Sequence, residues 1–145
     1  MRHWKKSLLA LAVAATSLTG CGTPQETTKD NTVGVNRQQK FSVSSEAINA
    51  EASKAYSQVL AEARAKRVLD TNPAMVARVK RITNNLIAKT PAIRADAKTW
   101  PWEIHVITLD EMNAWCMPHG KMVIYSGLID QLKLSDAEIA QVMGH

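Results

Sequence analysis

The residues best suited to chemistry in this chain are a serine, a cysteine–histidine pair and a histidine at its end. Ser126 stands in the stretch IYSGL, Cys116 lies three residues before His119, and the chain closes on His145. These residue types could provide a hydroxyl nucleophile, a thiolate–imidazole pair and a metal ligand, respectively. The surrounding residues decide which of the three chemistries the chain supports.

A serine or cysteine nucleophile is poorly supported. A nucleophile elbow needs Gly two residues before and two residues after the Ser, so that a strand can turn sharply into a helix. Those positions hold Ile124 and Leu128. The Cys116–His119 pair is also weak, because a catalytic Cys and His usually meet through tertiary folding rather than through closeness in the sequence.

The histidine at the end of the chain follows a segment that predicts a well-capped helix. Ser135 and Glu138 are spaced as a capping box. Gly144 and His145 form no helix stop signal, so we expect the helix to continue and the sequence to be cut inside it. Alone, His145 would be an exposed C-terminal residue with no role. Apolar residues of this helix have the spacing of a buried face: Ile139, Val142 and Met143.

Strands are predicted just before this helix. In WPWEIHVITLD the residue types alternate, with Trp102, Ile104 and Val106 on the more apolar face. His105 falls on the more polar face, and we interpret it as a surface or packed side chain rather than a ligand. The stretch KMVIYS predicts another strand, and GLIDQLKL predicts a short helix.

Two helices are predicted further upstream. One begins at Glu46 and ends near Asp70, and the second begins at Asn72–Pro73 and must end before Pro91. Their apolar residues recur at helical spacing, and the Met residues among them are interpreted as core fillers. Two helices, several strands and a capped helix indicate an α+β fold with helices packed on a small β-sheet.

The stretch NAWCMPHGKMVIYSGLIDQL, followed by SDAEIAQVMGH, resembles a zinc metallopeptidase family. That family includes the CAAX prenyl proteases, the HtpX heat-shock proteases, the mitochondrial Oma-type proteases and bacterial periplasmic lipoprotein relatives. The resemblance covers residues 75–145 and implies the N-terminal part of a zincin-like domain. The chain departs from the family at His119, where Gly is usual. The matching residues are Asn113, Ala114, Pro118, Gly120, Val123, Ser126, Gly127, Leu128, Asp136, Glu138, Ile139, Val142, Gly144 and His145.

The resemblance gives His145 a role as the first ligand of a His-Glu-x-x-His zinc site. Two His residues spaced this way stand on one helix face and reach the same Zn²⁺, while the intervening Glu activates the metal-bound water. In this family a downstream Glu is the third ligand. The general base, the second His and the third ligand would all lie beyond residue 145, so no catalytic residue is expected within the chain. We therefore expect the 145-residue chain to be inactive alone.

The resemblance also implies that the segment from Asn113 to Ser126 is the strand beside the substrate. An extended peptide can add to such a strand through backbone hydrogen bonds. A purely structural hairpin is the alternative interpretation. The expected substrate-binding residues are Asn113, Pro118, Gly120, Val123 and Tyr125.

The first residues are typical of an export signal. Residues 1–20 combine a basic start with a short apolar run, which is too short to span a membrane. Leu18-Thr19-Gly20-Cys21 resembles a bacterial lipobox, so we expect a lipid anchor at Cys21; an ordinary signal peptide with an incidental Cys is the alternative. Gly22 favours an outer-membrane anchor facing the periplasm. We assign residues 21–45 to a flexible tether and residues 46–145 to the metallopeptidase portion.

Charge and cysteine content limit the possible partners. The chain has a net charge of +5 from 18 basic and 13 acidic residues. Without the basic residues of the signal peptide this excess nearly disappears, so no nucleic-acid partner is expected. The chain has two cysteines, and with Cys21 acylated only the thiol of Cys116 remains free. We expect this thiol to be buried; the alternative is a disulfide with a Cys outside this sequence.

The leading functional hypothesis is a lipid-anchored zinc metalloendopeptidase of the bacterial envelope. Its expected substrates are misfolded or misassembled envelope proteins, which the resemblance implies and composition does not. The rival is a non-catalytic envelope lipoprotein whose truncated metallopeptidase scaffold binds other proteins. The sequence leaves the oligomeric state open.

Overall fold

A computed structural model of the chain describes residues 23–26 and 38–145. The expected signal peptide and Cys21 lie outside these residues. Part of the segment assigned to a tether is described, and there two short strands pair antiparallel. In chain order the elements are β1 (Thr23–Glu26), β2 (Gln38–Phe41), α1 (Ser45–Ala65), α2 (Pro73–Ile87), η1 (Thr90–Ala92), η2 (Ala95–Thr99), β3 (Glu103–Ile107), β4 (Ala114–Met117), β5 (Lys121–Tyr125), α3 (Ser126–Gln131) and α4 (Asp136–Gly144).

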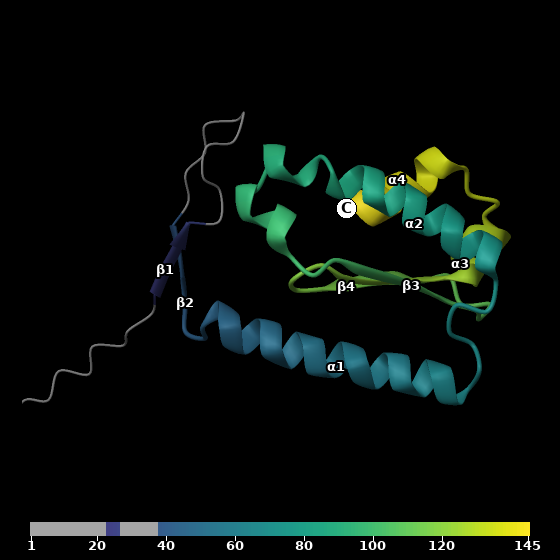
Figure 1. The fold of residues 1–145 in the computed structure, drawn as a ribbon, viewed down its shortest axis with the longest axis horizontal. Coiled ribbons are helices and arrows are strands. Elements are labelled where there is room, and N and C mark those ends of the chain that lie inside the picture. The colour runs from purple at the N-terminus through teal and green to yellow at the C-terminus, as the bar shows by residue number, and fades with distance from the viewer. Residues whose placement is uncertain (1–22, 27–37) are drawn as a thin grey trace, which may run out of the picture.

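A three-stranded sheet forms the middle layer of the fold. Its strand order is β3-β5-β4, with β3 parallel and β4 antiparallel to the central β5. Helix α1 covers one face of the sheet, while α2 and α4 cover the other (Figure 1). Helices packed on a small mixed sheet confirm the predicted α+β architecture.

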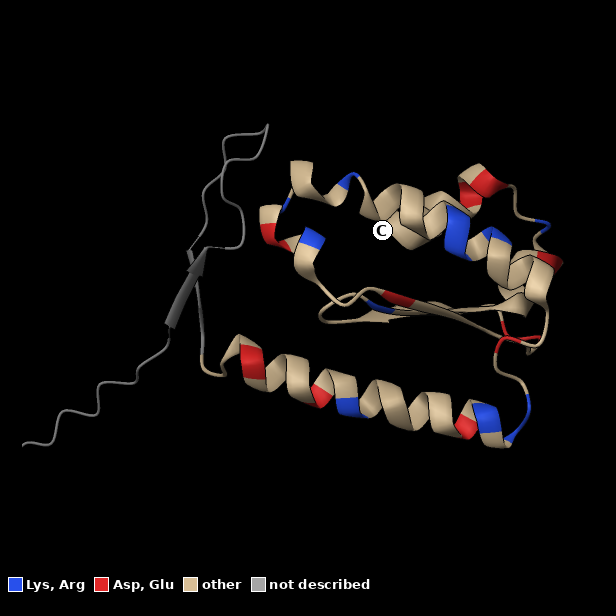
Figure 2. Ribbon diagram, viewed as in Figure 1, with Lys and Arg blue, Asp and Glu red and all other residues tan. Residues whose placement is uncertain are grey.

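Each face of the sheet has its own apolar core, because the side chains of a strand alternate between faces. On the α2–α4 face, Val79, Ile124 and Ile139 are fully buried. On the α1 face, Tyr56, Leu60 and Val123 are buried together. Figure 2 shows Lys, Arg, Asp and Glu interspersed along the helices rather than gathered over one element. The apolar stripes predicted from the sequence are therefore the faces that meet the sheet.

Helix α1 ends at Ala65, and the prediction that it extends to near Asp70 is wrong. The chain turns at Arg67, whose φ is +57°. The Val68 N–H then donates to the Ala63 carbonyl at 2.9 Å, as in a Schellman motif. This motif depends on a left-handed residue, which Gly usually marks and Arg does not, so the helix end had no sequence signal.

Helix α2 begins and ends where the sequence predicts. The Asn72 side chain accepts a hydrogen bond from the Met75 N–H at 3.1 Å, and Pro73 occupies the first turn, where its missing N–H costs no helical hydrogen bond. The helix ends at Ile87, before Pro91. Both boundary predictions are confirmed.

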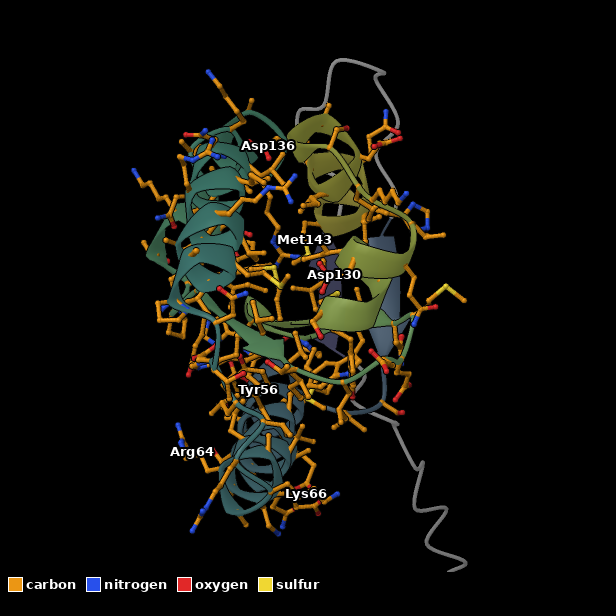
Figure 3. The ribbon with its side chains drawn as sticks, turned by 90° about the vertical axis from the view of Figure 1, so that its right-hand side faces the viewer. Tyr56, Arg64, Lys66, Asp130, Asp136 and Met143 are labelled. Atoms are coloured by element: carbon orange, nitrogen blue, oxygen red, sulfur yellow. The ribbon has the colours of Figure 1, made fainter. Side chains whose placement is uncertain are left out.

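Helix α4 starts with the predicted capping box. The Ser135 Oγ accepts from the Glu138 N–H, and the Glu138 carboxylate accepts from the Ser135 N–H at 2.8 Å. In its first turn Asp136 faces α2 (Figure 3), where Arg78 Nε and Arg81 Nη2 donate to its carboxylate at 2.6 and 2.8 Å. These contacts fix the start of α4 against α2.

The buried face of α4 is narrower than expected. Ile139 is fully buried and Met143 is half-buried, but Val142 is 38% exposed, so its predicted burial is wrong. Helix α4 meets α2 along one narrow stripe, and Val142 lies outside it. Across the part of the chain that the structure describes, no helix has both the length and the apolar character needed to cross a membrane.

Candidate functional site

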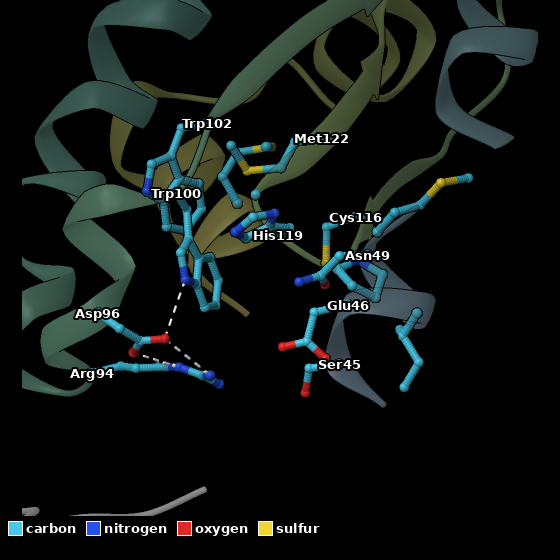
Figure 4. A pocket seen from close by; sticks show the side chains of 15 residues that line it. Ser45, Glu46, Asn49, Arg94, Asp96, Trp100, Trp102, Cys116, His119 and Met122 are labelled. Atoms are coloured by element: carbon cyan, nitrogen blue, oxygen red, sulfur yellow. Dashed lines mark hydrogen bonds and ion pairs between the residues drawn. The ribbon is translucent and has the colours of Figure 1, made fainter. Parts of the chain in front are cut away.

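A cleft of about 950 Å³ opens at the end of the sheet where the β4–β5 turn lies. Its walls come from the first turn of α1, the η2 region, the turn itself and the last turn of α4 (Figure 4). Met143 contributes from α4, and Cys116 contributes from β4. The cleft thus joins segments that are far apart in the sequence.

One wall of the cleft is aromatic. Trp100 stacks on Trp102 with ring centroids 5.4 Å apart, and His119 meets Trp100 edge-on at 5.7 Å. Arg94 lies over the Trp100 ring at 4.8 Å, and its guanidinium is paired with Asp96 at 2.8 Å. The geometry of Trp100 with Trp102 and Arg94 is that of ring stacking and a cation–π contact, so the wall is held together before any ligand arrives.

The β4–β5 hairpin turn packs against this aromatic wall. His119 and Gly120 have φ values of +67° and +77°. Consecutive left-handed residues match the twist of a tight hairpin, and His is among the side chains that tolerate this region. A Cβ on Gly120 would lie 2.8 Å from the Trp102 ring, so only Gly fits beneath it. The departure from the usual Gly at position 119 is therefore accommodated by a left-handed His.

The outer edge of β4 carries unpaired backbone groups. The Tyr125 N–H donates to the Asn113 carbonyl at 3.0 Å. Because bonded and non-bonded pairs alternate along antiparallel strands, Trp115 bonds β5 while the N–H and C=O of Cys116 point away from the sheet. Within the described residues no strand covers this edge.

The opposite edge of the sheet is occupied. Val68 and Asp70 run beside β3, where the Thr108 N–H donates to the Val68 carbonyl and the Asp70 N–H donates to the Val106 carbonyl, both at 2.8 Å. The Asp70 carboxylate also accepts the Val106 N–H at 2.9 Å. The C-terminal part of β3 is therefore already paired, whereas β4 has no such neighbour among the described residues.

His145 is exposed at the end of α4, two residues after Met143 of the cleft. A neutral imidazole is a suitable Zn²⁺ ligand, but a catalytic zinc site needs three protein ligands. Among residues 23–26 and 38–145, no group of three or more His, Cys, Asp or Glu side chains is arranged to hold a metal ion. The described residues therefore supply one candidate ligand and do not complete a site.

The structure separates the predicted substrate-binding residues. Pro118 and Gly120 line the cleft. Asn113 lies before β4, where its amide donates to Glu111 at 3.0 Å. Val123 is fully buried in the central strand, with its backbone between two paired strands, and Tyr125 packs on the α1 face. Neither Val123 nor Tyr125 faces the cleft, so a direct contact of these two side chains with a peptide there is not supported.

The prediction that the Cys116 thiol is buried is wrong. Cys116 is a free, exposed cysteine on the edge strand and lines the cleft. The alternation of β4 places Trp115 and Met117 in the core on the α1 face, which leaves Cys116 on the other face, near the strand end. Composition alone could not reveal on which side of an edge strand it would fall.

His105 belongs to a separate cluster of ionisable groups on the α1 face. Its Nδ1 lies 2.5 Å from Asp70 Oδ2 and its Nε2 lies 3.0 Å from Glu103 Oε1, while Lys121 Nζ donates to Glu103 Oε2 at 2.9 Å. Burial raises the pKa of Glu103, but hydrogen bonds from Lys121 and His105 outweigh this and hold the pKa below its usual 4.5. The interpretation of His105 as a packed side chain is confirmed.

Tyr56 closes this cluster from the helix side. Its hydroxyl donates to the Met122 carbonyl at 2.9 Å, and its ring meets Trp115 edge-on at 6.0 Å. Burial, followed by the negative charge of Glu103, raises the pKa of Tyr56 well above its ordinary range. The phenol therefore stays neutral and serves as a hydrogen-bond donor between α1 and the sheet.

Sequence reasoning missed the residues that build the aromatic wall. It placed Trp102 on the apolar face of a strand and gave Trp100, Arg94 and Asp96 no role. The available signal was the WPW stretch, in which two large aromatic residues flank a Pro just before a strand. Their joint contact with the β4–β5 turn depends on tertiary structure and had no local pattern.

Comparison with known proteins identifies relatives of this chain. The family model described as peptidase family M48 matches residues 73–145. Mitochondrial metalloendopeptidase OMA1 of Arabidopsis thaliana is 48% identical over 44 residues, covering 30% of this chain and 9% of the relative. Metalloprotease YcaL of Escherichia coli K12 is 29% identical over 147 aligned residues, covering 97% of this chain and 51% of the relative. The chain thus spans about half the length of YcaL and a smaller part of OMA1. No solved structure matches it.

Proposed function

The chain belongs to peptidase family M48, and on that premise we propose that the complete protein is a zinc-dependent metalloendopeptidase of the bacterial envelope. The observation that carries the proposal is the family match over residues 73–145, which ends on a Gly-His pair at the end of a capped helix. The names of the two relatives, a metalloendopeptidase and a metalloprotease, support the same reaction class.

In this proposal His145 provides one zinc ligand, and the remaining ligands and the general base come from residues that follow His145 in the complete protein. When bound, the metal supplies an activated water and a Lewis acid for hydrolysis of a peptide bond. The role of α4 is to hold the imidazole in place. The capping box at Ser135 and the contacts of Asp136 with α2 support that role by fixing the start of the helix.

The peptide is proposed to bind along the outer edge of β4 rather than along β5. The free N–H and C=O of Cys116 support this, because backbone pairing at an edge strand binds an extended peptide of any sequence. A broad-specificity protease needs this kind of recognition. The backbone N–H of Val123 has no place in this proposal, because β5 is paired with a strand on both sides.

Envelope localisation, a lipid anchor at Cys21 and misfolded or misassembled envelope proteins as substrates belong to the same proposal. They are supported by the sequence of the first residues and by the resemblance to envelope metallopeptidases. The rival, a non-catalytic envelope lipoprotein that uses this scaffold to bind proteins, predicts peptide binding without zinc or cleavage.

The metal part of the proposal is tested at His145 in the complete protein. His145→Ala should lower the zinc-to-protein ratio and abolish cleavage of a fluorogenic peptide. His119→Asn is the matched control for zinc, because Asn also tolerates a positive φ and the substitution removes an imidazole elsewhere. Full cleavage by a zinc-free His145→Ala protein would refute the mechanism.

The peptide part is tested at the β4 edge. Cys116→Pro removes the outward N–H without removing a sheet hydrogen bond, so cleavage should fall while zinc content is retained. Cys116→Ala removes the thiol but keeps the N–H, and it should cleave like the wild type. Equal activity of the Pro and Ala variants would place the peptide elsewhere.

A further inference from the structure

We propose that the cleft walled by Trp100 binds an apolar side chain of the peptide substrate and thereby selects where cleavage occurs. The preferred side chain is aromatic or large and aliphatic. This inference rests on the proposed peptidase function, and it adds a specificity site to the backbone recognition proposed at β4.

The wall of the cleft is rigid and apolar in advance of binding. The Trp102 indole N–H donates to the Ala97 carbonyl at 2.7 Å, and Trp100 is stacked on Trp102. Gly120 closes the space beneath Trp102 so tightly that no side chain fits there. A preordered wall loses little conformational entropy on binding, which favours recognition of a flat or bulky apolar group.

The charges around the cleft argue against an acidic side chain. Of the described lining residues, Arg94 is the sole Lys or Arg, and Asp96 already neutralises it through contacts at 2.8 and 3.2 Å. Glu46 stands on the opposite wall. A carboxylate placed here would face an acidic group and find its potential partner occupied, whereas an apolar side chain leaves the Arg94–Asp96 pair intact.

The occupant is a peptide because the cleft continues the free edge of β4. Cys116 and Met117 belong to this strand and also line the cleft. A strand paired with the outward groups of Cys116 runs beside β4 to the end of the sheet where the cleft opens, and it brings one of its side chains to the cleft. Met143 lines the same cleft two residues before His145, so a side chain held there lies close to the end of α4 that is proposed to bind the metal.

The first test is the cleavage preference of the complete protein. A peptide library that varies every residue type around a central position is digested, and the cut sites are identified by mass spectrometry. The wild type should favour Phe, Trp, Leu or Met at one fixed position from the cut. Trp100→Ala should reduce the preference for Phe over Ala by about tenfold, the factor expected for loss of an aromatic contact. Trp100→Phe should retain most of it.

The matched control is Leu132→Ala. Leu132 is also a large apolar residue with an exposed side chain, 55% accessible, but it lies at the end of α3 and does not line the cleft. The preference of this variant should equal that of the wild type. Thermal unfolding of all variants distinguishes a changed preference from loss of folded protein, and Trp100→Phe keeps the test valid if Trp100→Ala is unstable.

The second test separates this inference from the proposed function. The complete protein carrying His145→Ala, which should not cleave, is titrated with a Gly/Ser decapeptide that carries one central Phe, while the indole N–H resonances of Trp100 and Trp102 are followed by NMR. Both resonances should shift on titration with the Phe peptide. The dissociation constants for the matched Ala and Glu peptides should be about tenfold higher. Binding without cleavage by the complete protein would refute the proposed function and leave the cleft assignment standing.

Three outcomes would overturn the inference. The first is cleavage by the complete protein with no apolar preference, or with a preference unchanged in folded Trp100→Ala. The second is equal shifts with the Phe and Glu peptides. The third is no shift with any peptide. If a concentration-dependent dimer that Trp100→Ala abolishes is then found, the cleft is assigned to a second copy of the chain.

Discussion

At the scale of single residues, close backbone approaches determine which positions tolerate change. Gly127 is the second residue of α3, and a Cβ there would lie 2.4 Å from the Asp110 carbonyl carbon and 2.7 Å from the Glu111 carbonyl oxygen. Its N–H donates to the Leu109 carbonyl at 2.8 Å, so the loop cannot move away without losing that hydrogen bond. Gly127 therefore holds residues 109–111 against the start of α3.

Gly127→Ala should destabilise the protein strongly. Overpacking against backbone that cannot relax is expected to cost about 3 kcal/mol of unfolding free energy. Gly144→Ala is the matched control, because its Cβ would meet only Leu86 Cδ2 at 4.0 Å. That control should change stability by less than about 1 kcal/mol. Urea denaturation of the two variants provides the comparison, and equal midpoints would contradict it.

The ionisable cluster around His105 should make stability depend on pH in the acidic range. The pKa of Glu103 is lower in the folded protein than its ordinary 4.5. Between the two pKa values the unfolded chain binds more protons, so the stabilisation by Glu103 is present above pH 4.5 and is lost as the pH falls through the folded-state pKa.

Glu103→Gln tests this pH dependence. The variant keeps the shape of the side chain but cannot ionise, so its unfolding free energy should fall less steeply below pH 4.5 than that of the wild type. Thermal unfolding from pH 3 to pH 7 measures the difference. Parallel stability curves for the two proteins would show that Glu103 does not contribute in this way.

At the scale of elements, some helix ends could be predicted from the sequence and others could not. The starts of α2 and α4 are visible because Asn72, Pro73, Ser135 and Glu138 are residue types with specific capping roles. The end of α1 is hidden because its left-handed turn is made by Arg67, which carries no such signal. Local chemistry was predictable, whereas this conformation is imposed by packing of the following segment along β3.

The capping box of α4 should be worth a measurable part of the stability. Ser135→Ala removes the acceptor for the Glu138 N–H and should cost about 1 kcal/mol. Ser57→Ala is the control, because Ser57 is exposed in the middle of α1 and bonds only its own helix at Ser53. That change should be neutral or slightly stabilising, since Ala favours helix. Similar denaturation midpoints for the two variants would contradict the assignment.

At the scale of the whole molecule, the sequence predicted the layers of helices on a small sheet but not the cleft. Periodicity identified the faces of α1 and α2 because burial on a sheet requires it. The relation between Trp100 and His119 could not be predicted, because 19 positions separate them and no periodic pattern connects a loop with a turn. The order β3-β5-β4 was hidden for the same reason, and with it the central position of Val123.

The proposed lipid anchor predicts where the molecule resides. Wild-type protein expressed in a Gram-negative host should sediment with membranes and have an acylated N-terminal Cys, which mass spectrometry detects. Cys21→Ser should yield unprocessed or soluble protein, because two or three acyl chains are needed for stable anchoring. Cys116→Ser is the matched control and should remain with the membranes. A soluble wild-type protein that begins at another residue would refute the anchor.

The open edge of β4 also makes the chain liable to self-association. An unpaired strand accepts any extended backbone, including β4 of another copy, and such pairing is a common start of aggregation. The strand has only 4 residues, which limits how many hydrogen bonds an adventitious partner can form. Partial unfolding of the β4–β5 turn would lengthen the exposed edge and allow more intermolecular hydrogen bonds. The turn at Gly120 therefore contributes to the solubility of the protein as well as to its fold.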